Sequence, residues 1–112
     1  LVAVALDLFE NLREDHRYML DLRRTEALLL MRGNRWSESI PVLEAVLEAE
    51  ARVRPRPHPR RGVTQRMLAE ARTAVGDSIG ATAAWAAARE EFRALPPTHP
   101  ERRRVAEALG TG

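Results

Sequence analysis

Apolar residues recur every three or four positions along most of this chain, a spacing that predicts amphipathic helices. At the start of the chain, over residues 1–13, Val4, Leu8 and Leu12 keep this spacing. The charged stretch at residues 13–16 is expected to break the pattern, and a second helix should run over residues 17–32. The second helix has a broad apolar face made of Met19, Leu20, Leu22, Ala27, Leu28, Leu30 and Met31.

Turn-forming residues mark the ends of the next helices. Gly33 and Asn34 tolerate the left-handed conformation and should end the second helix. Ser37 is the expected cap of a third helix that extends to about residue 52, with Pro41 near its first turn. The alternating prolines of residues 54–59 then predict an extended linker.

The C-terminal half repeats this arrangement. A fourth helix is expected over about 63–75 and should end at Gly76, with Asp77 or Ser78 capping the fifth. The fifth helix, over about 78–95, has an apolar stripe that includes Ile79, Ala83, Trp85, Ala88 and Phe92. Two prolines follow it, and a last short helix is expected to reach about residue 109.

Three histidines recur at a nearly fixed interval. The steps from His16 to His58 and from His58 to His99 are almost equal (58 − 16 = 42 and 99 − 58 = 41), and each histidine stands where a helical pattern is expected to break. A period of about 40 residues indicates stacked helical repeats. A shift of 42 aligns Ala27 with Ala69, Asn34 with Gly76, Ser39 with Ala81, Val46 with Ala88, and Glu50 with Phe92. Each unit is therefore expected to be a helical hairpin, which must stack on a neighbour to bury its apolar face.

Small residues and turns at these positions are similar to those of a known repeat family. The first unit has Ala27, then Gly33, Asn34 and Trp36, then Ser39; the second has Leu68, Ala69, Gly76, Asp77, Ala81 and Ala88. The chain resembles tetratricopeptide repeats (TPR), in the longer variety found in kinesin light chains. The resemblance implies an all-α, right-handed superhelical stack of antiparallel hairpins. One domain would span residues 1–112: a trailing helix (1–13), two repeats (17–53 and 62–95) and a capping helix (99–109).

The resemblance also implies a binding groove. In this family the first helix of each repeat lines a concave groove that takes peptides, which here would place six residues in it: Arg24, Leu28, Met31, Arg66, Glu70 and Thr73. Arg24 and Arg66 are one period apart and would present two guanidinium groups to an acidic peptide or a C-terminal carboxylate. The asparagines of the family's carboxylate clamp are missing, so a receptor for chaperone tails is not expected.

Composition limits the chemistry. The 112 residues suit one domain. The chain has no cysteine, which excludes disulfides and thiolate metal sites. Histidines in successive loops lie too far apart to share a metal, so we expect them to cap loops or face solvent, with no cofactor bound. Gly-rich phosphate loops and paired-His helix motifs are absent, so catalysis is not expected.

All 18 basic residues are arginines, and the net charge is only +2. Five of them cluster in the linker region: Arg52, Arg54, Arg56, Arg60 and Arg61. Such a cluster could contact phosphates. No aromatic residue interleaves with it to stack on bases, and glutamates precede it, so a solvated linker is the favoured interpretation.

We therefore expect a non-catalytic, cytoplasmic scaffold that binds a protein or peptide partner, including another domain of its parent protein. The chain does not begin with Met, and we expect it to be a fragment of a larger bacterial regulatory or signalling protein. Asp7 interrupts the apolar residues 1–6, so no membrane span is expected. Two alternatives remain: a self-association module, in which a second copy covers the apolar face of the half-repeat, and a less favoured nucleic-acid-binding helical repeat.

Overall fold

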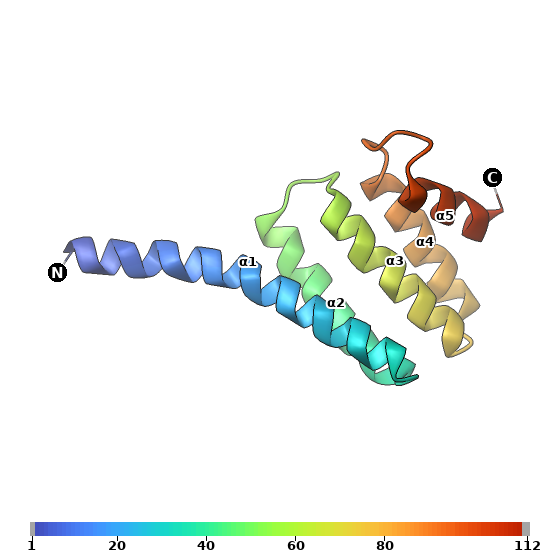
Figure 1. Ribbon diagram of the computed structural model, residues 1–112, viewed down its shortest axis with the longest axis horizontal. Coiled ribbons are helices and arrows are strands. Elements are labelled where there is room, and N and C mark those ends of the chain that lie inside the picture. The colour runs from blue at the N-terminus through green and yellow to red at the C-terminus, as the bar shows by residue number, and fades with distance from the viewer. Residues whose placement is uncertain (1, 111–112) are drawn as a thin grey trace.

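The computed structural model describes the backbone of residues 2–110 and the side chains of residues 17–110. The helices are α1 (Val2–Arg32), α2 (Trp36–Val53), α3 (Pro59–Ala74), α4 (Ser78–Glu91) and α5 (Pro100–Leu109). Each helix packs against the next in chain order, in sequential antiparallel pairs (Figure 1). The all-α class expected from the sequence is confirmed for the described residues.

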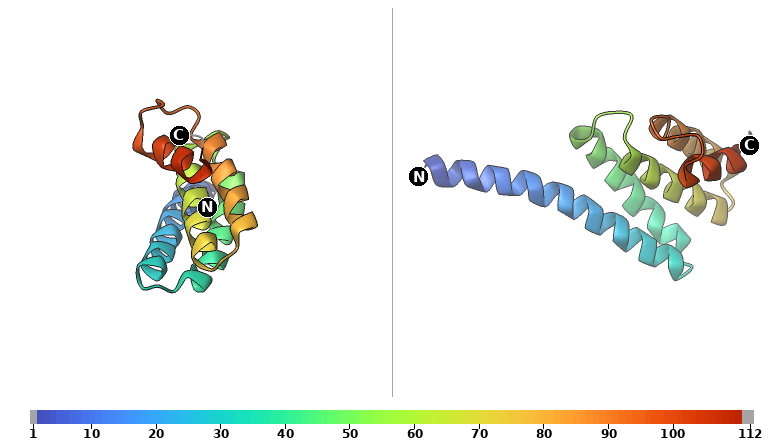
Figure 2. Two further views of the ribbon diagram at one scale, coloured as in Figure 1. Left: turned by 90° about the vertical axis from the view of Figure 1, so that its right-hand side faces the viewer. Right: turned by 45° about the horizontal axis from the view of Figure 1, so that its top comes forward.

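The other four helices flank α3 on two sides. In the view along the long axis, α2 and α4 lie on one side of α3, and α1 and α5 lie on the other (Figure 2). The molecule measures 57 × 32 × 19 Å along its principal axes. Its long dimension comes from α1, whose N-terminal half projects beyond the other helices (Figure 1).

Helix α1 is continuous through residues 13–16, where a break was expected. That prediction was wrong because charge alone does not end a helix. The stretch contains neither glycine nor proline, and its arginine and glutamate are good helix formers. The backbone of His16 consequently lies within a helix rather than in a loop, while its side chain lies outside the described residues.

The turns of the two hairpins share one backbone geometry. Asn34 and Gly76, which are one period apart, both have positive φ, at 61° and 87°. In each turn the N–H of this residue donates to the carbonyl three residues earlier, and the next N–H donates to the carbonyl five residues earlier. These bonds satisfy carbonyls at the helix end, as in other left-handed caps. Both predicted turns are confirmed.

Helices α3 and α5 begin with the same dipeptide, His-Pro. His58 and His99 are the N-cap residues, and a proline follows each at the first helical position, where its missing N–H costs nothing. Each imidazole accepts a hydrogen bond at Nδ1 from the N–H two residues on, at 3.1 Å in both cases. The capping role expected of the histidines is confirmed for these two. Because His58 caps α3, the helix begins at Pro59 and not near Val63.

Two further helix ends differ from expectation. Ser37 does not cap α2, because the preceding turn closes at Arg35 and the helix begins at Trp36. Helix α4 ends at Glu91 instead of continuing to Leu95, since a following proline disfavours the helical conformation at residue 95. The Asp77 cap is confirmed: its carboxylate accepts a hydrogen bond from the N–H of Gly80 at 2.9 Å.

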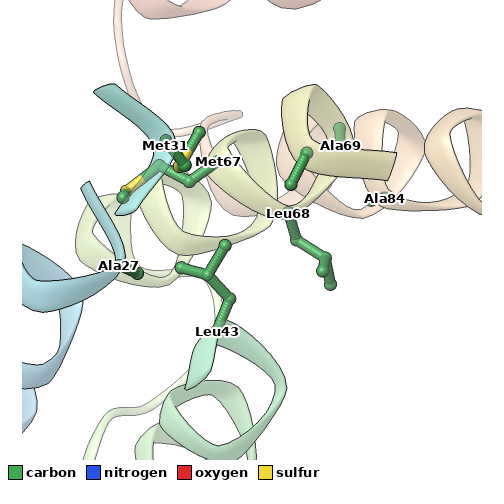
Figure 3. Close-up of a cluster of buried hydrophobic side chains, with 8 residues drawn as sticks. Ala27, Met31, Leu43, Met67, Leu68, Ala69 and Ala84 are labelled. Carbon is green, nitrogen blue, oxygen red and sulfur yellow. The ribbon is translucent and has the colours of Figure 1, made fainter. Parts of the chain in front are cut away.

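The main core lies where α1, α2, α3 and α4 meet (Figure 3). Small side chains there allow the helices to approach closely. Four of the five pairs that the shift of 42 aligns are at most 4% exposed in both units: Ala27 and Ala69, Ser39 and Ala81, Val46 and Ala88, Glu50 and Phe92. These four pairs therefore mark positions at which the helices of both units are buried. Trp36 and Trp85 are partly buried against this core.

A second cluster joins α4 to α5 through Ala88, Phe92 and Val105. The Phe92 ring lies directly on Gly62 of α3, where an added Cβ would overlap the ring. The apolar stripe expected along α4 is partly wrong. Ile79 is 86% exposed and Ala83 is also exposed, because the inner face of the helix follows its alanines at 81, 84 and 88.

The Gly62–Phe92 contact can be tested by substitution. Alanine normally stabilises a helix relative to glycine by about 1 kcal/mol. Gly62→Ala should nevertheless lower the free energy of unfolding by roughly 1–3 kcal/mol, because the new methyl overlaps the ring. Urea denaturation followed by circular dichroism measures this change. The same substitution should cost less in a Phe92→Leu background, and a stabilising Gly62→Ala would contradict the contact.

Candidate functional site

The six predicted groove residues lie on α1 and α3, but they differ in accessibility. Thr73 is exposed, Leu28 and Glu70 are partly buried, and Met31 lies in the core with 4% exposure. Met31 therefore offers no surface to a ligand. The guanidinium-bearing side chains of Arg24 and Arg66 are each 15% exposed. The structure places these two arginines at equivalent positions on neighbouring helices.

Arg24 is held by groups from three helices. Its Nη2 lies 2.8 Å from the Asp21 carboxylate on the same helix. Its Nη1 lies 3.5 Å from Glu50 of α2 and donates to the Arg60 carbonyl at 3.4 Å, in the first turn of α3. The arginine thus links α1 to both following helices.

Arg66 makes the corresponding link from α3 to α5. Its Nη1 lies 2.6 Å from Glu70, four residues later on the same helix, and its Nε lies 2.8 Å from Glu101 in the first turn of α5. Burial of the guanidinium lowers its pKa, but the hydrogen bonds that it donates to the two carboxylates, together with their charge, outweigh this and raise the pKa above its ordinary value. Arg66 is therefore a permanent, paired cation.

These contacts form a row of matched charges along the first helices of the units. We call it the charged row: Asp21, Arg24, Arg60, Arg66, Glu70 and Glu101. Arg60 completes it with a 2.6 Å contact to Asp21. Because each arginine already faces a carboxylate of the chain, an acidic ligand must displace one of these carboxylates to bind. Sequence reasoning found both arginines but missed Asp21, Glu50 and Glu101, since helix packing brings the latter two in from 26 and 35 residues away.

Next to the charged row lies a fully buried carboxylate. Glu50 has no exposed surface and accepts a hydrogen bond from the Thr64 hydroxyl at 2.7 Å. Arg54 Nε lies 3.0 Å away as an ion pair, without the alignment of a hydrogen bond. Burial lowers the pKa of Arg54, and its neighbours Glu50 and Asp21 oppose the shift. Glu50 therefore depends on Thr64, Arg24 and Arg54 to offset its desolvation.

This dependence predicts a large effect of truncation. Glu50→Ala leaves two arginines without their buried partner, so the free energy of unfolding should fall by about 3 kcal/mol. Glu48→Ala is the matched control on the same helix. Its pair with Arg52 is exposed, and exposed pairs contribute little. Chemical denaturation of both variants checks the prediction, and equal midpoints would show that Glu50 is not buried as described.

The five arginines expected as a basic linker are mostly paired. Arg52 pairs with Glu48, Arg54 with Glu50 and Arg60 with Asp21. Arg61 is 1% exposed and forms a buried pair with Glu91 at 2.5 Å. Only Arg56 of the five has no ion pair among the described side chains. The cluster is therefore largely paired with carboxylates. Glu48 and Glu50 precede it on α2, as the sequence shows, whereas Asp21 and Glu91 come from other helices.

Neither histidine cap is arranged to bind a metal. The described residues contain no group of three histidine, aspartate or glutamate side chains placed to hold a metal ion. Burial and the nearby Arg54 lower the pKa of His58, which keeps its Nδ1 free to accept the capping hydrogen bond at neutral pH. Among the described residues, no helix is long and apolar enough to cross a membrane.

Comparisons with protein-family models, with curated proteins and with solved structures find no match to this chain.

Proposed function

We propose that this chain is a non-catalytic protein-interaction module, built as a TPR-like superhelical stack and belonging to a larger bacterial regulatory or signalling protein. The observation that supports this most is the equivalence of its two hairpins. At positions one period apart, the two hairpins have the same hydrogen bonds in their turns and the same buried small residues. Stacked hairpins of this kind create an extended surface along their first helices.

The proposed binding surface is the face of α1, α3 and α5 that carries the charged row. The accessible groups beside Arg66 on α3 are Glu70 and Thr73. With three arginines and three carboxylates in the row, a partner segment that carries charges of both signs would match it best. Binding such a segment replaces ion pairs within the row by ion pairs with the segment. Because few ion pairs are gained in total, the charges contribute more to specificity than to affinity.

Thr73 offers a clean test of this surface, because it is exposed and its hydroxyl only donates to the Ala69 carbonyl at 2.8 Å. We expect Thr73→Arg to reduce partner binding about tenfold by obstructing the face and adding an unmatched charge. The measurement is capture of proteins from a lysate of a high-GC bacterium, identification by mass spectrometry, and titration of the captured protein against each variant.

Ala83→Arg is the control. Ala83 is exposed on α4 and does not line the groove in which Thr73 lies beside Thr82 and Trp85. Arg24→Glu is less informative, since it would put a second carboxylate beside buried Glu50. A partner that binds wild type, Thr73→Arg and Ala83→Arg equally would contradict the proposed surface.

A further inference from the structure

The exposed side of α1 carries a regular line of side chains. Tyr18 is 64% exposed, Leu22 44% and Leu29 63%, and exposed Thr25 completes the line. The four residues are spaced by four, three and four positions, which is the heptad spacing at which two helices pack side by side. We call this line the outer seam. It borders an open, mainly apolar groove of about 500 Å³.

Three of the four seam positions are buried one unit later; the fourth, Tyr18, corresponds to Arg60, whose side chain is 52% exposed. A shift of one period carries Leu22, Thr25 and Leu29 onto Thr64, Met67 and Ala71 of α3, which are at most 3% exposed. Met67 and Ala71 pack in the core with residues of α1 and α2, and Thr64 bonds Glu50 of α2. Leu22, Thr25 and Leu29 are therefore at positions where this fold packs one helix on another. In α1 they have no partner within the described residues.

The charges beside the seam identify the occupant. Arg23 and Glu26 are exposed on one flank of the seam. In the described part of the chain neither takes part in an ion pair. In an antiparallel pair of α1 helices centred between residues 22 and 25, Arg23 of each copy lies beside Glu26 of the other. A parallel pair would instead set each charge beside its own copy, which is unfavourable.

The rest of the seam is also self-complementary in this arrangement. Tyr18 of one copy lies opposite Leu29 of the other, and Leu22 lies opposite Thr25, so every layer contains at least one apolar side chain. With 31 residues, α1 is about 46 Å long. We propose that two copies of this chain pair through antiparallel α1 helices along the outer seam, forming a homodimer. This inference goes beyond the proposed function; Asp21 of the charged row borders the seam, but none of the four seam residues belongs to that row.

Sedimentation equilibrium of the full chain, over roughly 1–200 μM, tests the dimer. We expect a reversible monomer–dimer equilibrium. Leu29→Glu should weaken dimerisation at least about 100-fold, because it buries a charge in the seam. Ile79→Glu is the control: it changes an even more exposed apolar residue away from the seam and should leave the equilibrium unchanged. Circular dichroism verifies that both variants remain helical.

Charge exchange tests the antiparallel orientation. Arg23→Glu and Glu26→Arg alone should each weaken dimerisation about tenfold. Each substitution places like charges side by side at both of the symmetry-related contacts between residues 23 and 26. The double variant should return to within about threefold of wild type. A monomeric wild-type chain, equal effects of Leu29→Glu and Ile79→Glu, or a double variant no better than the singles would overturn the proposal.

Discussion

Burial of α3 between the helix pairs α1–α2 and α4–α5 is the interaction on which the rest of the structure depends. Neither α1–α2 nor α4–α5 can cover its own apolar face, and both cover it against α3. Seven of the 16 residues of α3 are buried as a result. Small side chains at the crossings, Ala27, Ala69 and Ala84, let the backbones come close enough for this packing.

Equivalent positions one period apart are packed with different chemistry. Buried Glu50 of α2 contacts Thr64 of α3; one period later, Phe92 at the end of α4 packs with Val105 of α5. The aromatic ring fits only because α3 has Gly62 beneath it, whereas the equivalent position in α1 is buried Leu20. The polar contact adds the ion pairs of Arg24 and Arg54. A buried polar group of this kind favours one register of packing over others, and we regard that as its role here.

Local signals in the sequence predicted most of the fold but only part of the candidate site. Gly76 ended a helix and Asp77 capped the next as expected, and the small residues at a period of 42 marked the core. The period also led to an error, because the residue types at 13–16 permit a helix and α1 continues through them. In the site, the sequence placed both arginines of the groove but could not find Glu50 or Glu101, since these contacts depend on helix packing across 26 and 35 residues. The sequence predicted two free guanidinium groups, whereas the structure has a row of paired charges. A partner must therefore compete with the carboxylates of this row.

Amide hydrogen exchange measured by NMR tests the central position of α3 most directly. Local opening is least frequent where an element is packed on both sides, so exchange should be slowest in α3 between Met67 and Ala71. The amides of α1 before residue 16 and those of α5 should exchange faster. If instead the amides of α1 and α2 exchange more slowly than those of α3, the hairpin α1–α2 is stable on its own. That result would contradict the account of α3 as the shared core.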